Sequence, residues 1–269
     1  MEVRSSPGSL IRYLNLVALF SGGILSLLAD HSPNHSDRLP FQLGERLEYE
    51  MKWGFFPVGS AVMEVFAKNP KDEKSPIIVR FEVRTNPFAD NFYKVRTSIT
   101  STLDSGFSRT LKYDKSQHEG KTKREIEVLY HYDKGEVSYI ENQTEPRITK
   151  IPGNVFDPLS IAYFFRLHPL TAGGKTVLPT CDGKRFQEVV VTAGQRERIS
   201  LPNGKVFAIE TNPSLKNLGG VFNKSPKGML KVWYTDDPRR VPVRVSSKVV
   251  VGSFTASLVR ADPPLVSYE

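Results

Sequence analysis

Apolar and polar side chains alternate with a period of two along much of the chain. In residues 45–53 the apolar residues Leu47, Tyr49, Met51 and Trp53 stand at every second position, and charged residues fill the positions between them. The same pattern recurs in residues 77–84 and 125–132. Successive side chains of a β-strand point to opposite faces, so this period predicts antiparallel strands with one buried and one wet face.

Further segments rich in β-branched and aromatic residues are also predicted to be strands. They are 58–66, 92–103, 108–113, 136–140, 185–192, 196–201, 205–211, 229–235, 241–251 and 254–259. Asp-Gly and Asn-Gly turns, such as Asp182-Gly183 and Asn203-Gly204, separate several of them, because Gly and Asn tolerate the positive φ of hairpin turns. Strands joined by tight turns pair with their neighbours, which predicts a meander and excludes a parallel α/β sheet.

One segment departs from the strand pattern. Asp157 suits the N-cap of a helix, Pro158 suits its first turn, and Pro169 ends it, so one short helix is predicted at about residues 158–167. Such a helix would plug the end of a barrel or lie across the open side of a curved sheet. The predicted fold class is therefore all-β: a strongly twisted antiparallel meander, curled into a barrel-like or half-barrel sheet, with one short helix.

The N-terminal residues have the order of a secretory signal peptide. Arg4 and Arg12 come before an apolar run at residues 14–29, and the chain turns polar at Asp30. As a helix the run would reach about 24 Å, short of a hydrocarbon core of about 30 Å. Cleavage after Ala29 and export to the periplasm or medium are therefore expected, and a retained N-terminal anchor is the alternative.

The rest of the chain is expected to be organised as one domain. Residues 30–40 are predicted to be a flexible segment, 41–262 a single β-rich domain and 263–269 a tail. A division of the domain into two halves near residues 145–175 is left open. Residues 212–228 form a long loop within an otherwise tightly turned sheet, which favours a surface insertion over a lid or contact loop.

Composition and charge narrow the class of protein. The chain has 269 residues and a formal net charge of +8, and loss of residues 1–29 would lower this charge to +7. Without an arginine-rich run or an aromatic-basic RNA motif, such a charge favours solubility and attraction to anionic membranes or polysaccharides over nucleic-acid binding. The single Cys excludes a disulfide scaffold, a multi-cysteine zinc site and an iron–sulfur cluster.

Residues that could carry catalysis are scattered. Cys181 would need a His to activate it, and His118, His131 and His168 stand apart without metal-ligand spacing. Asp236-Asp237 precede Pro238 between two strands, which favours a hairpin turn over an acid pair. No catalytic constellation, metal site or cofactor is predicted, so a non-enzymatic role is expected.

Several landmarks resemble a known family of bacterial exported proteins. They are Phe41 to Tyr49 followed by Gly59, then Asp157-Pro158-Leu159 with Arg166, then residues 228–243 with Gly252-Ser253-Phe254. Together they are similar to the family labelled domain of unknown function 3108. The resemblance covers nearly the whole chain after residue 40. It implies a secreted or periplasmic β-rich protein and brings no established reaction or catalytic residues.

The leading functional hypothesis is a binder of an amphipathic or lipid-like ligand in the concave face of the sheet. The aromatic inner face of the first strands exceeds what one helix can cover, and basic residues lie near its rim. The candidate ligand-binding residues are Tyr49, Met51, Trp53, Phe81, Tyr93, Arg166 and Trp233. Arg166 would face an anionic ligand group, or pair with Asp157 or a strand carboxylate. A dry, fully filled interior would argue against this hypothesis.

The alternative hypothesis is a glycan or cell-wall binding module. Tyr139, Trp233 or Tyr234 would then be stacking platforms on an exposed face. This hypothesis requires those rings to be accessible to solvent. A hydrolase with a scattered site is a third and less favoured hypothesis.

Overall fold

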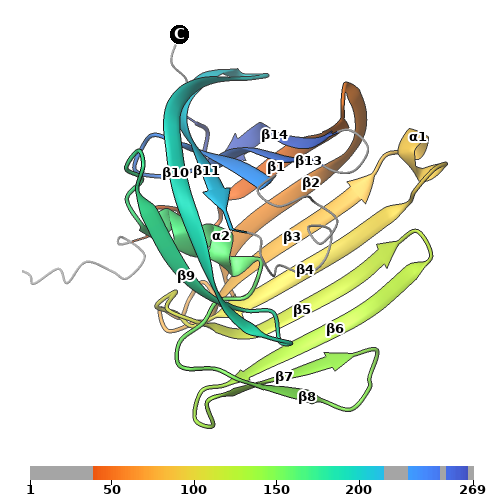
Figure 1. Ribbon diagram of the computed structural model, residues 1–269, viewed down its shortest axis with the longest axis vertical. Coiled ribbons are helices and arrows are strands. Elements are labelled where there is room, and N and C mark those ends of the chain that lie inside the picture. Colours follow the sequence, from red (N-terminus) through yellow and green to blue (C-terminus); the bar gives the residue numbers. More distant parts are fainter. Residues whose placement is uncertain (1–38, 215–229, 249–252, 266–269) are drawn as a thin grey trace, which may run out of the picture. The chain divides into compact units, whose positions relative to one another are not determined.

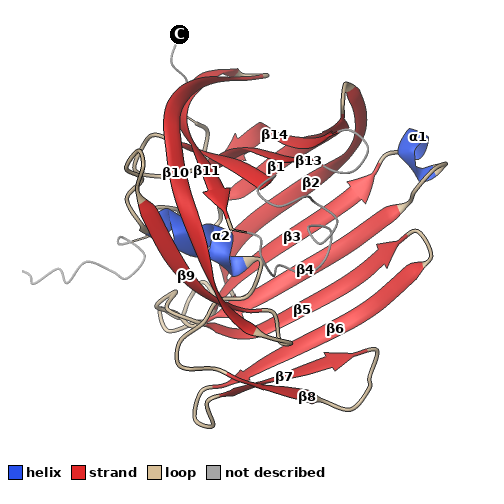
Figure 2. Ribbon diagram, viewed as in Figure 1, coloured by secondary structure: helices blue, strands red, loops and turns tan. Residues whose placement is uncertain are grey.

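The computed structural model describes residues 39–214, 230–248 and 253–265, and almost all of them are organised around one antiparallel sheet (Figures 1 and 2). The strands are β1 (Arg46–Trp53), β2 (Phe56–Ala67), β3 (Ile77–Thr85), β4 (Val95–Leu103), β5 (Thr110–Glu119), β6 (Thr122–His131), β7 (Glu136–Glu141), β8 (Arg147–Lys150), β9 (Lys175–Cys181), β10 (Phe186–Leu201), β11 (Gly204–Pro213), β12 (Leu230–Thr235), β13 (Pro242–Lys248) and β14 (Ser253–Asp262). The helical segments are α1 (Pro87–Asp90), α2 (Ser160–Phe164) and the 3-10 turn η2 (Phe165–Leu167). The predicted all-β class is confirmed.

The topology consists of two meanders joined through the first and last strands. The strand order is β8-β7-β6-β5-β4-β3-β2-β1-β14-β13-β12-β11-β10-β9. Each strand pairs antiparallel with the next one in sequence except β8 and β9, which are the two outer strands, and β1 pairs antiparallel with β14. The predicted meander is therefore confirmed, with the helix in the connection between its two parts.

The sheet curls until its two outer strands approach each other, but no continuous ladder closes it. Residues 151–157 lie in this seam. The Phe156 N–H donates to the Pro179 carbonyl at 2.9 Å, and the Cys181 N–H donates back to the Phe156 carbonyl at 2.9 Å. The Thr110 N–H at the start of β5 donates to the Val155 carbonyl at 3.0 Å. The Thr149 hydroxyl on β8 donates to the carbonyl of Gly183, just after β9, at 2.8 Å. These bonds satisfy backbone groups that an open sheet edge would leave unpaired, and they make the sheet barrel-like.

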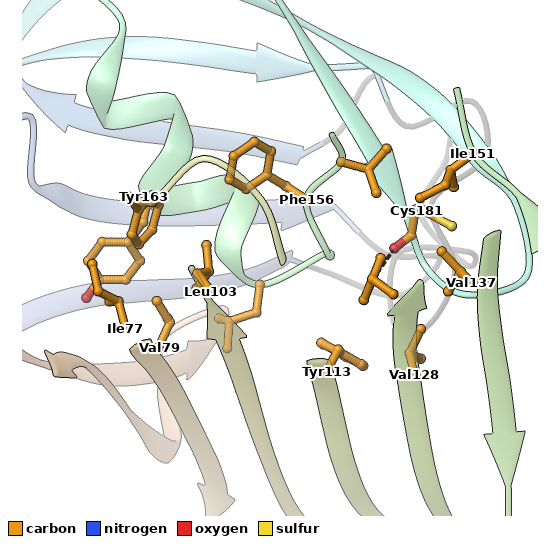
Figure 3. Packing of buried hydrophobic residues seen from close by; sticks show 14 of the residues in the cluster. Ile77, Val79, Leu103, Tyr113, Val128, Val137, Ile151, Phe156, Tyr163 and Cys181 are labelled. Carbon is orange, nitrogen blue, oxygen red and sulfur yellow. Dashed lines mark hydrogen bonds between the residues drawn. The ribbon is translucent and has the colours of Figure 1, made fainter. Parts of the chain in front are cut away.

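The core fills the space between the helix and the inner face of the sheet (Figure 3). Phe156 and Tyr163 lie over the strand residues Ile77, Val79 and Leu103, and all five are at most 2 % exposed. A second cluster packs around Leu47 and Trp233. Burying this apolar surface is the main force that holds the helix on the sheet.

Some elements differ from the sequence prediction. Strands β8 and β9 were not predicted, because Pro146 and Pro152 flank the four residues of β8 and Pro179 lies inside β9, and proline is typical of loops and strand edges. The two strands predicted at 185–192 and 196–201 are the single strand β10, which carries an irregularity between Ala193 and Arg196. The strand predicted at 92–103 begins at Val95, after helix α1.

Several predicted segments fall wholly or partly outside the described residues. They are the signal peptide at residues 1–29, most of the flexible segment at 30–40, most of the loop at 212–228, the end of the strand predicted at 241–251 and residues 266–269 of the tail. Among the described helices, none is long and apolar enough to cross a membrane.

Candidate functional site

Strand β1 leads from the core to one open end of the sheet, where its side chains become progressively exposed. Tyr49 is 5 % exposed, and its hydroxyl donates to the Pro242 carbonyl at 2.8 Å. Met51, two residues further on, is half-buried, and Trp53 is 44 % exposed. Tyr49 is therefore a core residue, whereas Met51 and Trp53 lie where a ligand could reach them.

The inner face near this end carries a row of half-buried apolar residues across four strands. Phe81 on β3 is paired with Ile99 on β4, Ile99 with Lys115 on β5, and Lys115 with Ile126 on β6. Phe81, Ile99 and Ile126 pack against the core cluster from its edge, so this row faces the inside of the curled sheet. We name Met51, Phe81, Val83, Ile99, Lys115 and Ile126 the inner-face site.

Lys115 is a charged group in the middle of this apolar row. Isoleucines flank it on both neighbouring strands, and directly paired side chains lie about 5 Å apart. Burial lowers the pKa of Lys115, and Arg124 lowers it further, while Glu119 acts in the opposite direction. Among the described residues, none forms an ion pair with Lys115 within 4.0 Å. A carboxylate or phosphate brought to this row would supply the missing partner.

The aromatic platforms of the glycan hypothesis are buried. Tyr139 is 7 % exposed, and the Lys184 ammonium lies 4.4 Å from the centre of its ring. Trp233 is 8 % exposed and donates its indole N–H to Glu197. Tyr234 is 4 % exposed and packs on Phe165 with ring centres 4.9 Å apart. These rings are part of the core, so the glycan hypothesis loses the residues on which it depended, and Trp233, also predicted to bind a ligand, is a core residue.

Arg166 is also an internal residue. Its guanidinium donates to both carboxylate oxygens of Glu45, at 2.5 and 2.9 Å, and both side chains are fully buried. Its Nε donates to the Arg239 carbonyl at 3.0 Å, and the rings of Phe41 and Tyr163 each lie 5.0 Å from its guanidinium carbon. Arg166 thus joins the helical segment to the start of β1 and to the β12–β13 turn. Of the partners expected for it, a carboxylate beside a strand is the one observed.

Asp157 anchors the start of α2 on strands β4 and β5. Its carboxylate accepts hydrogen bonds from the hydroxyls of Ser101, Thr110 and Ser160 at 2.6–2.8 Å. It also accepts from the backbone N–H groups of Leu159 and Ser160 at 2.8 and 3.0 Å. The predicted capping role is observed, although the regular helix begins at Ser160 rather than Pro158. The fully buried carboxylate is satisfied within the protein.

The other groups considered are the thiol of Cys181 and the side chains that could bind a metal ion. Cys181 is free and fully buried, and burial raises the pKa of its thiol to about 11, so it is protonated at neutral pH. Within the described ranges, no group of three or more His, Cys, Asp or Glu side chains is placed to hold a metal ion. Two hollows, of about 350 and 410 Å³, lie beside β4–β6 and beside residues 168–177. Lys115 and Ile126 of the inner-face site help to line the first hollow, whereas Met51, Phe81 and Val83 line neither.

Sequence reasoning found Met51 and Phe81 but missed Lys115. The strand predicted at 108–113 ends two residues before Lys115, whereas β5 continues to Glu119. Extending the period of two from Tyr113 would have placed Lys115 on the buried face and marked it as an unusual lysine. Tyr93, another predicted residue, is 54 % exposed at the strand ends, outside the row itself.

The fold places the chain in the class of antiparallel, barrel-like β proteins. The chain belongs to the family described as Protein of unknown function (DUF3108), whose profile matches residues 48–259. No curated protein sequence matches it. The chain resembles the crystal structure of a beta-barrel-like protein of domain of unknown function DUF1849 from Brucella abortus, with a TM-score of 0.52 and 10 % identity over 81 % of this chain and 97 % of that one. That likeness supports the fold alone.

A second solved structure aligns less well. It is a protein from Bacteroides fragilis with a YmcC-like fold, at a TM-score of 0.34 and 8 % identity over 83 % of this chain and 97 % of that one.

Proposed function

We propose that this protein is an exported, non-enzymatic binder of an amphipathic, lipid-like ligand with an anionic headgroup. The observation that carries the proposal is Lys115, a half-buried lysine between two isoleucines with no ion-pair partner among the described residues. The headgroup would pair with Lys115, and the apolar chain would lie along Phe81, Val83 and Met51. Export rests on the N-terminal sequence pattern.

The physical basis of the proposal is the combination of one charge with an apolar surface. A lysine taken partly out of water loses hydration, and an anion at the same depth restores favourable electrostatics. The half-buried side chains around it gain by covering the ligand's hydrocarbon. A ligand with an anionic headgroup and a hydrocarbon chain contacts both Lys115 and the apolar side chains. A fully polar ligand would contact favourably only Lys115, and a fully apolar ligand only the apolar side chains.

The test is titration of the full chain with a fluorescent long-chain fatty acid and with the matching long-chain alcohol. The unmodified protein is expected to prefer the acid. Lys115→Met is expected to weaken acid binding by roughly tenfold or more, because a charge-assisted contact is lost, and to leave alcohol binding unchanged. Lys115→Arg is expected to keep the preference for the acid.

The matched control is Lys112→Met on the same strand. Lys112 forms ion pairs with Asp114 and Glu127 at 2.9 and 2.8 Å and lies on the opposite face from Lys115. Its replacement is expected to leave binding of the acid unchanged. Equal affinity of the unmodified protein for acid and alcohol, or no binding of either, would overturn the proposal.

A further inference from the structure

Exposed aromatic side chains gather at the end of the sheet to which β1 leads. We name this group the aromatic rim: Trp53, Phe55, Phe56, Phe88, Phe92, Tyr93 and Phe254. They belong to the β1–β2 turn, to the connection through α1, and to the start of β14, which the antiparallel topology brings to one end (Figure 1). Phe55 is 96 % exposed and Phe92 is 78 % exposed. Large apolar side chains gathered on a surface mark an interaction site.

Contacts between the connections make the rim one supported surface. The Gly54 N–H donates to the Ser253 carbonyl at 3.0 Å, which ties the β1–β2 turn to β14. The Asn86 side-chain amide donates to the Pro57 carbonyl at 2.7 Å, which ties α1 to the same turn. A Cβ atom on Gly120 would lie only 2.6 Å from the Tyr93 ring, so the β5–β6 turn packs directly under that ring. These contacts join the connections that carry the rings to one another.

The surroundings of the rim are strongly basic. The segments 52–57, 84–96 and 118–123 contain six Lys or Arg residues and two acidic residues, a net charge of +4. Both acids are engaged within the protein, since Asp90 pairs with Arg96 at 2.7 Å and Glu119 accepts from Thr97 at 3.1 Å. Lys94, Lys121 and Lys123 are exposed and form no ion pair within 4.0 Å with any residue that the structure describes.

Four of these positions form a row across the outer face. Arg84 is paired with Arg96, Arg96 with His118, and His118 with Lys123, on strands β3 to β6. Arg84 and Arg96 are like charges directly opposite each other, an arrangement that destabilises a sheet, and within the protein Asp90 compensates only Arg96. An external anionic surface would pair with Arg84 and Lys123 while the neighbouring rings cover apolar material.

We propose that the aromatic rim is a docking surface for an anionic lipid bilayer. Aromatic rings favour the interface between membrane and water, and peripheral binding grows with buried apolar area and with attraction to anionic lipids. Exposed rings on several connections, with exposed lysines on the α1–β4 connection and the β5–β6 turn, suit a deformable, negatively charged surface. The rim does not depend on the inner-face site, so an empty protein docks as well.

The experiment measures binding of the full chain to vesicles of equal parts phosphatidylglycerol and phosphatidylcholine, and to vesicles of phosphatidylcholine alone. The protein is expected to bind the anionic vesicles, more weakly as salt is raised. Trp53 provides an internal probe, because the only other tryptophan, Trp233, is buried. Binding is expected to shift tryptophan emission to the blue, and Trp53→Phe is expected to abolish the shift while vesicle binding continues.

Two rim variants test the two forces separately. Phe55→Ser with Phe92→Ser is expected to weaken binding by roughly tenfold or more through lost apolar burial. Lys121→Ala with Lys123→Ala is expected to weaken it by about fivefold per lysine. The matched controls are Ile148→Ser, which removes a 51 % exposed apolar residue on β8, and Lys71→Ala with Lys74→Ala in the β2–β3 connection at the opposite end. Both controls are expected to bind like the unmodified protein.

Three results would overturn the proposal. They are failure of the protein to bind anionic vesicles, equal binding to neutral vesicles, and rim variants that bind as well as the controls. Association of the chain with itself through the rim, lost in the phenylalanine variant and without vesicle binding, would also overturn it. Lys115→Met is expected to keep vesicle binding, so failure of the proposed ligand site is distinguishable from failure of the rim.

Discussion

At the scale of single residues, Lys115 has opposite effects on stability and on the proposed function: its partly buried charge lowers the stability of the fold, but the same charge would bind the ligand. Its side chain is drawn partly out of water, and burial lowers its pKa. A buried lysine without a partner lowers the stability of the fold. Its retention in an apolar row is understandable if an anion from outside the chain pairs with it.

Replacement of Lys115 by methionine should therefore stabilise the protein while it weakens binding of the anionic ligand. We expect Lys115→Met to raise the free energy of unfolding by about 1 kcal/mol, because the desolvated charge is gone. Urea unfolding measures this change, with Lys112→Met as the control that should not stabilise. A loss of stability in Lys115→Met would contradict the assignment, since it would show that Lys115 is favourably paired in the free protein.

The sequence pattern predicted on which face of a strand a residue lies, but not how deeply it is buried or which distant residue it contacts. The alternation in β1 correctly placed Tyr49, Met51 and Trp53 on one face, but not how deeply each is buried, because depth depends on which strands and helix lie over each position. Arg166 is 121 residues from its partner Glu45, so its pairing depends on the folded arrangement of distant segments. Trp233, Tyr139 and Tyr234 were proposed from the sequence as stacking platforms for a glycan. In the structure these three rings are buried in the core.

At the scale of elements, the Glu45–Arg166 pair joins the helical segment to the first strand. Glu45→Ala leaves the Arg166 charge buried without its partner, and we expect it to lower the free energy of unfolding by about 3–5 kcal/mol. The combined Glu45→Met and Arg166→Met variant removes both charges and should be less destabilised than Glu45→Ala. A double-mutant cycle by urea unfolding gives the coupling between the two residues.

The neighbouring residue supplies the control for this prediction. Arg46 pairs with Glu64 at 2.5 Å, but its side chain is 42 % exposed. Arg46→Ala is expected to change the free energy of unfolding by no more than about 1 kcal/mol. If Glu45→Ala cost no more than Arg46→Ala, the buried pair would have no structural role.

The order of the strands was predictable, whereas several element boundaries were not. Tight turns imply pairing of successive strands, and this local rule is enough for the meanders β1–β8 and β9–β14. The pairing of β1 with β14 joins residues about 200 positions apart and has no local signal. The sequence Asn86-Pro87 is a signal for the start of helix α1, and in the structure the Asn86 side chain accepts a hydrogen bond from the Ala89 N–H at 2.9 Å. The aromatic residues that follow the helix nevertheless favoured a strand in the sequence prediction.

At the scale of the whole molecule, buried tyrosines couple the fold to pH. Burial raises the pKa of seven of them above 10: Tyr49, Tyr113, Tyr130, Tyr132, Tyr139, Tyr163 and Tyr234. Above pH 10 the unfolded chain releases these protons while the folded chain retains them. The stability is therefore complete below pH 10 and should fall steeply as the pH rises above it.

Urea unfolding at a series of alkaline pH values tests this expectation, with the ultraviolet absorbance of tyrosinate followed in parallel. The increase in tyrosinate absorbance should coincide with unfolding rather than precede it. Ionisation of most tyrosines near pH 10 in a chain that stays folded would contradict the burial of these rings.

The central claim is that the inner face of the sheet holds an anionic amphiphile through Lys115. The most direct measurement is mass spectrometry of solvent extracts from the protein and from Lys115→Met, both exported in bacteria and purified without detergent. The unmodified protein is expected to carry about one carboxylate- or phosphate-bearing amphiphile per chain, and the variant is expected to carry little. An empty unmodified protein that also fails to bind added fatty acid would contradict it.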